Sequence, residues 1–106
     1  MSYDIYLMDN TQHNERVCEE SFNITWNVGK MFYSWSPQGI RLIYGMTGRQ
    51  SLMYLLDLHN YLIENYDKMV ELEPSNGYGS WENTVKCINK MCIVAARHPE
   101  CVWEGD

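Results

Sequence analysis

Basic side chains are scarce in this sequence. Its 106 residues include 8 Lys and Arg against 14 Asp and Glu, which gives a formal net charge of -6. A surface that binds duplex nucleic acid needs clustered lysine and arginine, so we expect no direct nucleic-acid binding. The same charge suits a protein partner with a basic surface, because complementary potentials steer encounter, although acidity also serves solubility alone.

Long apolar runs are also missing. No stretch approaches the roughly twenty apolar residues that a membrane-spanning helix needs. Residues 1–10 have neither the basic start nor the apolar centre of a secretory signal. We therefore expect no membrane contact and a cytoplasmic location.

Recognisable catalytic motifs are absent as well. The segment 44–49 contains two glycines but lacks the lysine and the glycine spacing of a phosphate-binding loop. The three histidines lie on separate segments, and His59 on an apolar helix face is typical of a hydrogen-bonded core residue. We expect no cofactor and no catalytic residue, and the sequence leaves open whether any enzymatic activity exists.

The cysteines do not have the spacing of a metal site. The paired two-residue gaps of a zinc ribbon are missing, and cytoplasmic thiols are usually reduced. We therefore predict reduced thiols without zinc at Cys18, Cys87, Cys92 and Cys101.

The most regular pattern lies at 47–70, where apolar residues recur with the spacing of one helix face. Thr47 and Gln50 have the form of a capping box at its start, and Pro74 follows its end. We predict that this is the longest helix. Its buried residues are expected to include Leu52, Leu55, Leu56, Leu62 and Ile63.

Shorter elements flank that helix. Residues 3–9 alternate as a strand does, and residues 16–22 are predicted to complete an N-terminal hairpin. Further helices are predicted over 23–35, with Asn23 or Thr25 as the cap, over 40–44 and over 80–98. Trp103 is expected to dock on the core. The sequence thus predicts an α+β fold over 1–106, with a short N-terminal β-hairpin packed on three to four helices in a single domain.

Two groups of residues are candidates for binding. Asn23, Thr25 and Asn27 share a face if that segment is extended and diverge on a helix. The start of the long helix can hold an anion. The first group, a ligand pocket, comprises Asn23, Thr25, Asn27, Arg41, Thr47 and Arg49. The second, a partner-binding group at a glycine-bracketed loop, comprises Tyr78, Trp81 and Glu82.

Several short motifs stand along the chain: Ser-Tyr-Asp-Ile-Tyr-Leu at 2–7, Asn-Ile-Thr-Trp-Asn at 23–27, Gly-Ile-Arg at 39–41, Tyr-Gly-Met-Thr-Gly at 44–48, Trp-Glu-Asn at 81–83 and His-Pro-Glu-Cys-Val-Trp-Glu-Gly-Asp at 98–106. In combination they resemble a family of small uncharacterised proteins found in phages and bacterial genomes. That family has no established activity, so the resemblance implies a phage setting and no particular chemistry.

Two hypotheses about function follow. The first is a non-catalytic, phage-associated binding protein that acts in the host cytoplasm as an inhibitor or adaptor of a host protein, including counter-defence proteins of the anti-CRISPR kind. The second is a small-molecule or nucleotide binder, or a minor enzyme, with a pocket near Asn23, Thr25, Asn27 and the Thr47 helix start. A homodimer is compatible with either, because 13% aromatic residues leave material for an interface.

Overall fold

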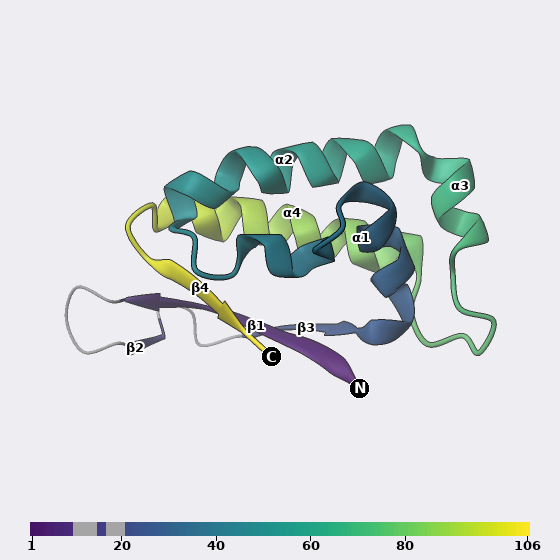
Figure 1. The fold of residues 1–106 in the computed structure, drawn as a ribbon, viewed down its shortest axis with the longest axis horizontal. Coiled ribbons are helices and arrows are strands. Elements are labelled where there is room, and N and C mark those ends of the chain that lie inside the picture. The colour runs from purple at the N-terminus through teal and green to yellow at the C-terminus, as the bar shows by residue number, and fades with distance from the viewer. Residues whose placement is uncertain (10–14, 17–20) are drawn as a thin grey trace.

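The computed structural model describes residues 1–9, 15–16 and 21–106. An antiparallel sheet forms one side of the molecule, and the helices cover one of its faces (Figure 1). The elements in chain order are β1 (Ser2–Asp9), β2 (Glu15–Arg16), β3 (Phe22–Thr25), the 3-10 helix η1 (Trp26–Val28), α1 (Gly29–Trp35), the 3-10 helix η2 (Gly39–Ile43), α2 (Gly48–Glu64), α3 (Tyr66–Glu71), α4 (Trp81–Arg97) and β4 (Val102–Gly105). The predicted α+β class is confirmed.

The strand β1 is the centre of the sheet. Ile5 pairs with Phe22 of β3 and with Gly105 of β4, so β3 and β4 lie on opposite edges of β1. β2 pairs with the end of β1 on the β3 side, because Met8 pairs with both Arg16 and Val102. The pairing of β1 with β2 is the start of the predicted hairpin, but residues 17–20 of its predicted second strand lie outside the described residues.

The sequence predicts a helix from residue 23 that is capped by Asn23 or Thr25, and the structure contradicts the start at Asn23 and confirms the cap at Thr25. Ile24 is buried between the outward-facing Asn23 and Thr25, which is the alternation of a strand, and pairing with β1 holds the segment extended. The Thr25 Oγ1 then accepts a hydrogen bond from the Asn27 N–H at 3.2 Å, so Thr25 caps η1. Helical structure therefore begins only after Thr25.

The capping box at Thr47 and Gln50 is present, with both reciprocal hydrogen bonds. The helix predicted over 47–70 is nevertheless divided at Asn65, where α2 ends and α3 begins. The Asn65 side chain donates to the Tyr61 carbonyl oxygen at 2.9 Å, a local bond of the kind that competes with helix continuation. As a result α2 and α4 have the same length of 17 residues.

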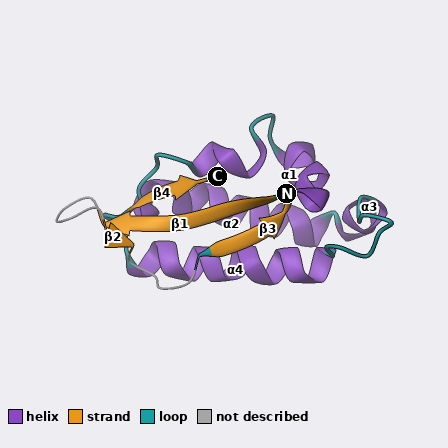
Figure 2. Ribbon diagram, turned by 90° about the horizontal axis from the view of Figure 1, so that it is seen from below, coloured by secondary structure: helices purple, strands orange, loops and turns teal. Residues whose placement is uncertain are grey.

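The helices α2 and α4 pack side by side, and α2 lies farther from the sheet than α4 (Figure 1). At its start α2 touches the end of α4 so closely that a side chain at Gly48 would overlap the carbonyl oxygens of Ala95 and His98. The Gly48 N–H also donates to the Cys101 carbonyl oxygen at 2.8 Å. This junction leads the chain from α4 into β4 (Figure 2).

The core contains one apolar cluster drawn from all layers, and Trp103 is fully buried in it, as predicted. Leu55, Leu58 and Leu62 are the fully buried leucines of α2. The prediction that Leu56 and Ile63 are buried is wrong, because these side chains are 48% and 45% exposed. Within the described ranges no helix is long and apolar enough to cross a membrane.

Candidate functional site

The six predicted ligand residues do not form one pocket. Asn23 and Thr25 line a depression of about 260 Å³ between β3 and the start of α4. Asn27 lines a different depression, beside the 71–76 segment. Arg41 lies in a third place, an aromatic cleft of about 220 Å³ with Tyr3, Trp26 and Tyr33. The pocket that we predicted from the sequence is therefore not assembled.

The hydrogen-bonding groups at the start of α2 are already paired with other parts of the protein. Thr47 is taken up by the capping box, and the Arg49 N–H donates to the Pro99 carbonyl oxygen at 3.0 Å. The Arg49 side chain forms an exposed ion pair with Glu100 at 2.7 Å. These contacts leave the predicted anion site at this helix start without the backbone donors it requires.

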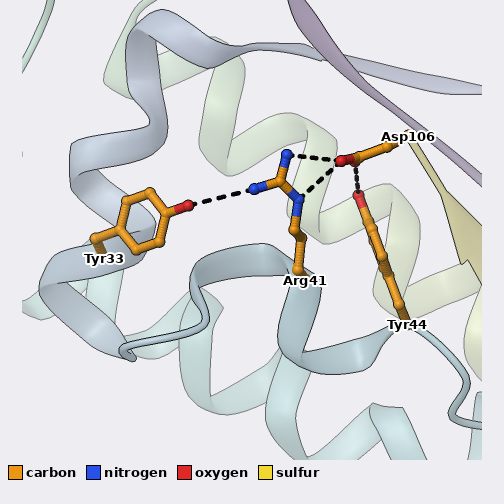
Figure 3. Close-up of polar contacts among 4 residues, drawn as sticks. All are labelled: Tyr33, Arg41, Tyr44 and Asp106. Atoms are coloured by element: carbon orange, nitrogen blue, oxygen red, sulfur yellow. Dashed lines mark hydrogen bonds and ion pairs between the residues drawn. The ribbon is translucent and has the colours of Figure 1, made fainter.

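Arg41 is held in a network of polar contacts (Figure 3). Its guanidinium donates to the Asp106 carboxylate through Nε at 2.8 Å and lies 2.6 Å from it through a second nitrogen. The Tyr44 hydroxyl donates to the other Asp106 oxygen at 2.8 Å, and Arg41 also donates to the Tyr33 hydroxyl at 3.4 Å. The network ties η2 to the end of β4.

Aromatic rings complete the surroundings of Arg41. Its guanidinium carbon lies 5.0 Å from the centre of the Tyr3 ring and 5.7 Å from that of Trp26, within range of a cation–π contact. Because Asp106 already compensates the charge of Arg41, this cluster is suited to fastening the chain and poorly suited to capturing an anion. It also brings no nucleophile and base together, so it offers no acid–base chemistry.

The pKa of Asp106 is set by two opposing effects. Burial raises the pKa of this carboxyl, but the hydrogen bonds from Arg41 and Tyr44 outweigh it and hold the pKa below its ordinary value. Burial, followed by the hydrogen bond to Asp106, raises the pKa of the Tyr44 phenol. The ionised carboxylate and the protonated phenol are thus the forms that the fold stabilises.

Arg41→Gln should lower the free energy of unfolding by on the order of 1 kcal/mol at neutral pH, since the ion pair is partly exposed. A depressed folded-state pKa gives stability that is fully present above the unfolded value, about 3.9 for Asp, and is lost as pH falls through the folded value. The difference between wild type and variant should therefore vanish in acid. Urea unfolding across pH measures it.

Arg49→Gln is the matched control, because the Arg49–Glu100 pair is far more exposed. We expect that variant to change the free energy of unfolding by less than about 0.5 kcal/mol. An Arg41→Gln effect that stays the same from neutral to acid pH would contradict the role given to Asp106.

The predicted partner-binding residues lie close together at the start of α4 but differ in exposure. Tyr78 is 72% exposed in the loop before the helix. Trp81 is half-buried against Tyr66, and its indole N–H donates to the Leu62 carbonyl oxygen at 2.7 Å. Glu82 is exposed and pairs with Lys86 at 3.2 Å. Trp81 therefore has a clear structural role in joining α4 to the end of α2.

The fold raises the pKa of the three thiols that the structure describes. Burial raises the pKa of Cys87 and of Cys92 to about 11, and burial with nearby Asp9 and Glu100 raises the pKa of Cys101. Within the part of the chain that the structure describes, which excludes Cys18, no cluster of His, Cys, Asp or Glu is arranged to hold a metal ion. His59 is half-buried on α2.

The surface that sequence reasoning missed is an apolar stripe on the outside of α2. Met53, Leu56 and Ile63 are 79%, 48% and 45% exposed, and their spacing places them along one side of the helix. We call these three residues the α2 face. Neighbouring carboxylates come from Asp57 and Glu64.

Acidic residues outnumber basic ones in the segment that contains the α2 face. The segment from Gly48 to Glu73 has two basic residues, Arg49 and Lys68, and five acidic ones: Asp57, Glu64, Asp67, Glu71 and Glu73. The exposed Asn60 interrupts this stripe between Leu56 and Ile63. Large exposed apolar patches commonly mark sites of protein association. No family model, curated protein or solved structure matches this chain.

Proposed function

We propose that this protein works without catalysis, as a binding protein that docks the α2 face onto a partner protein with a basic surface. The observation that carries the proposal is the exposed stripe of Met53, Leu56 and Ile63 on α2, within a segment in which acidic residues outnumber basic ones. Apolar side chains at the centre of an interface supply most of the affinity, and surrounding charges supply specificity and speed of encounter.

The charge of the segment around the α2 face also indicates which kind of partner it suits. A two-fold contact through this face would bring together two copies of a segment in which acidic residues outnumber basic ones, and like-charge repulsion disfavours that. No such repulsion arises with a partner whose apolar binding site is surrounded by Lys and Arg. Within this proposal the protein acts in the cytoplasm as an inhibitor or adaptor, and a host enzyme with a basic substrate channel, as in counter-defence, is a partner of the right charge.

Glu64→Lys should slow association with the partner about tenfold and leave its dissociation rate nearly unchanged, because a rim charge acts mainly by steering encounter. Raising the ionic strength should slow wild-type association in the same way, since the Debye length is only about 10 Å at 0.1 M salt. The measurement is surface plasmon resonance with the partner recovered from a host lysate.

Glu104→Lys is the charge-matched control, because Glu104 is exposed on β4, in the sheet, whereas the α2 face lies on the helix layer. It should leave the association rate within about twofold of wild type. Equal slowing by both variants would mean that only net charge matters, and it would count against docking through the α2 face.

A further inference from the structure

A groove runs between β3 and α4. A depression of about 260 Å³ and one of about 300 Å³ share Asn23, Asn83 and Cys87, so they form one continuous groove. Both views of the fold show the axes of β3 and α4 lying nearly parallel, with the chain running in opposite directions along them, and α4 extending past the edge of β3 (Figure 2). Helix α4 therefore forms the base of the groove beside strand β3.

The edge of β3 that faces this groove is open among the described strands. β3 pairs with β1 along its other edge, and no described strand pairs with it on the groove side. An open strand edge presents N–H and C=O groups that an added strand can satisfy. Extended peptides bind sheet edges in this way, with their side chains alternating between the floor and solvent.

The groove is basic although the protein is acidic. Lys86 and Lys90 line it, and the described residues of its lining include no carboxylate. Lys86 pairs with Glu82 at the exposed surface, where such pairs are weak and readily exchanged. A ligand that brings negative charge therefore meets two ammonium groups in a chain whose net charge is -6.

The spacing of the lysines matches a strand. Residues four apart on a helix are separated by about 6 Å along its axis, and alternate residues of a strand by about 6.7 Å. Carboxylates at alternate positions of an added strand would thus meet Lys86 and Lys90 in register. A nucleic-acid strand could meet the charges but could not supply the alternating donors and acceptors that the sheet edge requires.

We infer that the groove between β3 and α4 binds an extended acidic segment of a partner protein, which adds a strand to β3 and sets its carboxylates against Lys86 and Lys90. This surface is separate from the α2 face and carries the opposite charge. The two would let one domain bridge an acidic segment and a basic protein, and failure of either leaves the other standing.

The probe is a fluorescent peptide of alternating Val and Glu, about six residues long, a common strand length. Fluorescence anisotropy should show saturable binding to the full chain. A peptide with Lys in place of Glu should bind at least about tenfold more weakly because of its charge. An acidic peptide with Pro at alternate positions should also bind at least about tenfold more weakly, because it lacks backbone donors.

Substitutions locate the site. Lys86→Glu with Lys90→Glu should weaken binding of the acidic peptide at least about tenfold. The control pair, Lys30→Glu with Lys68→Glu, changes the net charge by the same amount as the first pair but lies outside the groove lining. It should change the affinity for the acidic peptide less than about twofold. Equal loss in both pairs, or equal binding of the Pro-containing peptide, overturns the inference.

Thiol chemistry gives a second readout. Cys87 is half-buried and lines both parts of the groove, whereas Cys101 is half-buried outside it. Saturating peptide should slow alkylation of Cys87, followed by mass spectrometry of the digested protein, and leave Cys101 unchanged. Unchanged alkylation at Cys87, or protection by an oligothymidylate and not by the peptide, would contradict binding of an acidic strand.

Discussion

Replacing Trp103 by alanine should lower the free energy of unfolding by about 3–5 kcal/mol, the cost typical of removing a large buried aromatic side chain. The indole is fully buried, and its ring packs edge-on against Phe22 at 6.0 Å. Its N–H donates to the Ser51 hydroxyl at 2.8 Å. The residue thus joins the sheet to α2 across the core.

Urea unfolding followed by circular dichroism measures the loss. Domains of this size have a total stability of about 5–15 kcal/mol, so Trp103→Ala should remove a large fraction of it. Trp103→Phe keeps most of the apolar contact while deleting the bond to Ser51, and it should cost much less than alanine. A loss below about 1 kcal/mol for Trp103→Ala would show that β4 is not part of the cooperative core.

The largest expected effect on binding is that of Leu56→Asp. An apolar residue at the centre of an interface commonly contributes about 2 kcal/mol or more, so partner affinity should fall at least about thirtyfold. The side chain is half exposed in the free protein. The free energy of unfolding should therefore change by less than about 1 kcal/mol. Calorimetric titration of the partner and urea unfolding of the variant measure the two quantities separately.

Ile93→Asp is the control for that variant. Ile93 is 43% exposed, almost the same as Leu56, but it lies on α4 with Lys86, Lys90 and Arg97. It should leave the affinity of this partner within about twofold. If both variants lose the partner equally, exposed apolar area in general, and not the α2 face, accounts for binding.

Local signals in the sequence predicted the fold class and several element ends. The Thr47 capping box, the Ser80 cap and the alternation at Tyr3, Ile5 and Leu7 depend on neighbouring residues only, so they can be recognised without the tertiary structure. The buried place of Trp103 was also predictable, because a tryptophan is costly to leave in water.

The α2 face was not predicted because the apolar arc of this helix is wider than its neighbours cover. Leu55, Leu58 and Leu62 face the core, and Leu56 and Ile63 continue the same arc onto the outside. Periodicity locates the apolar side of a helix but does not say where burial stops. The apolar arc is wide, because it includes Leu58 as well as Leu56. That width was the signal in the sequence that part of the arc would be exposed.

The Arg41 network and the groove depend on contacts between distant parts of the chain. Arg41 and Asp106 are 65 residues apart, and neither has a local pattern that points to the other. The candidate pocket failed for the same reason. Asn23 is held extended by pairing with β1, whereas Thr47 is used to cap α2, so residues grouped by chemical type were placed apart by the fold.

The most direct test of the docking proposal is photocrosslinking from the α2 face. A photoreactive phenylalanine analogue at position 56, and separately at position 93, would be activated in a host lysate and the products identified by mass spectrometry. We expect position 56 to crosslink to one partner protein through a lysine- or arginine-rich segment, with a yield that falls at high salt, and position 93 not to capture that protein. The same set of proteins from both positions, or no product at position 56, would contradict the proposal.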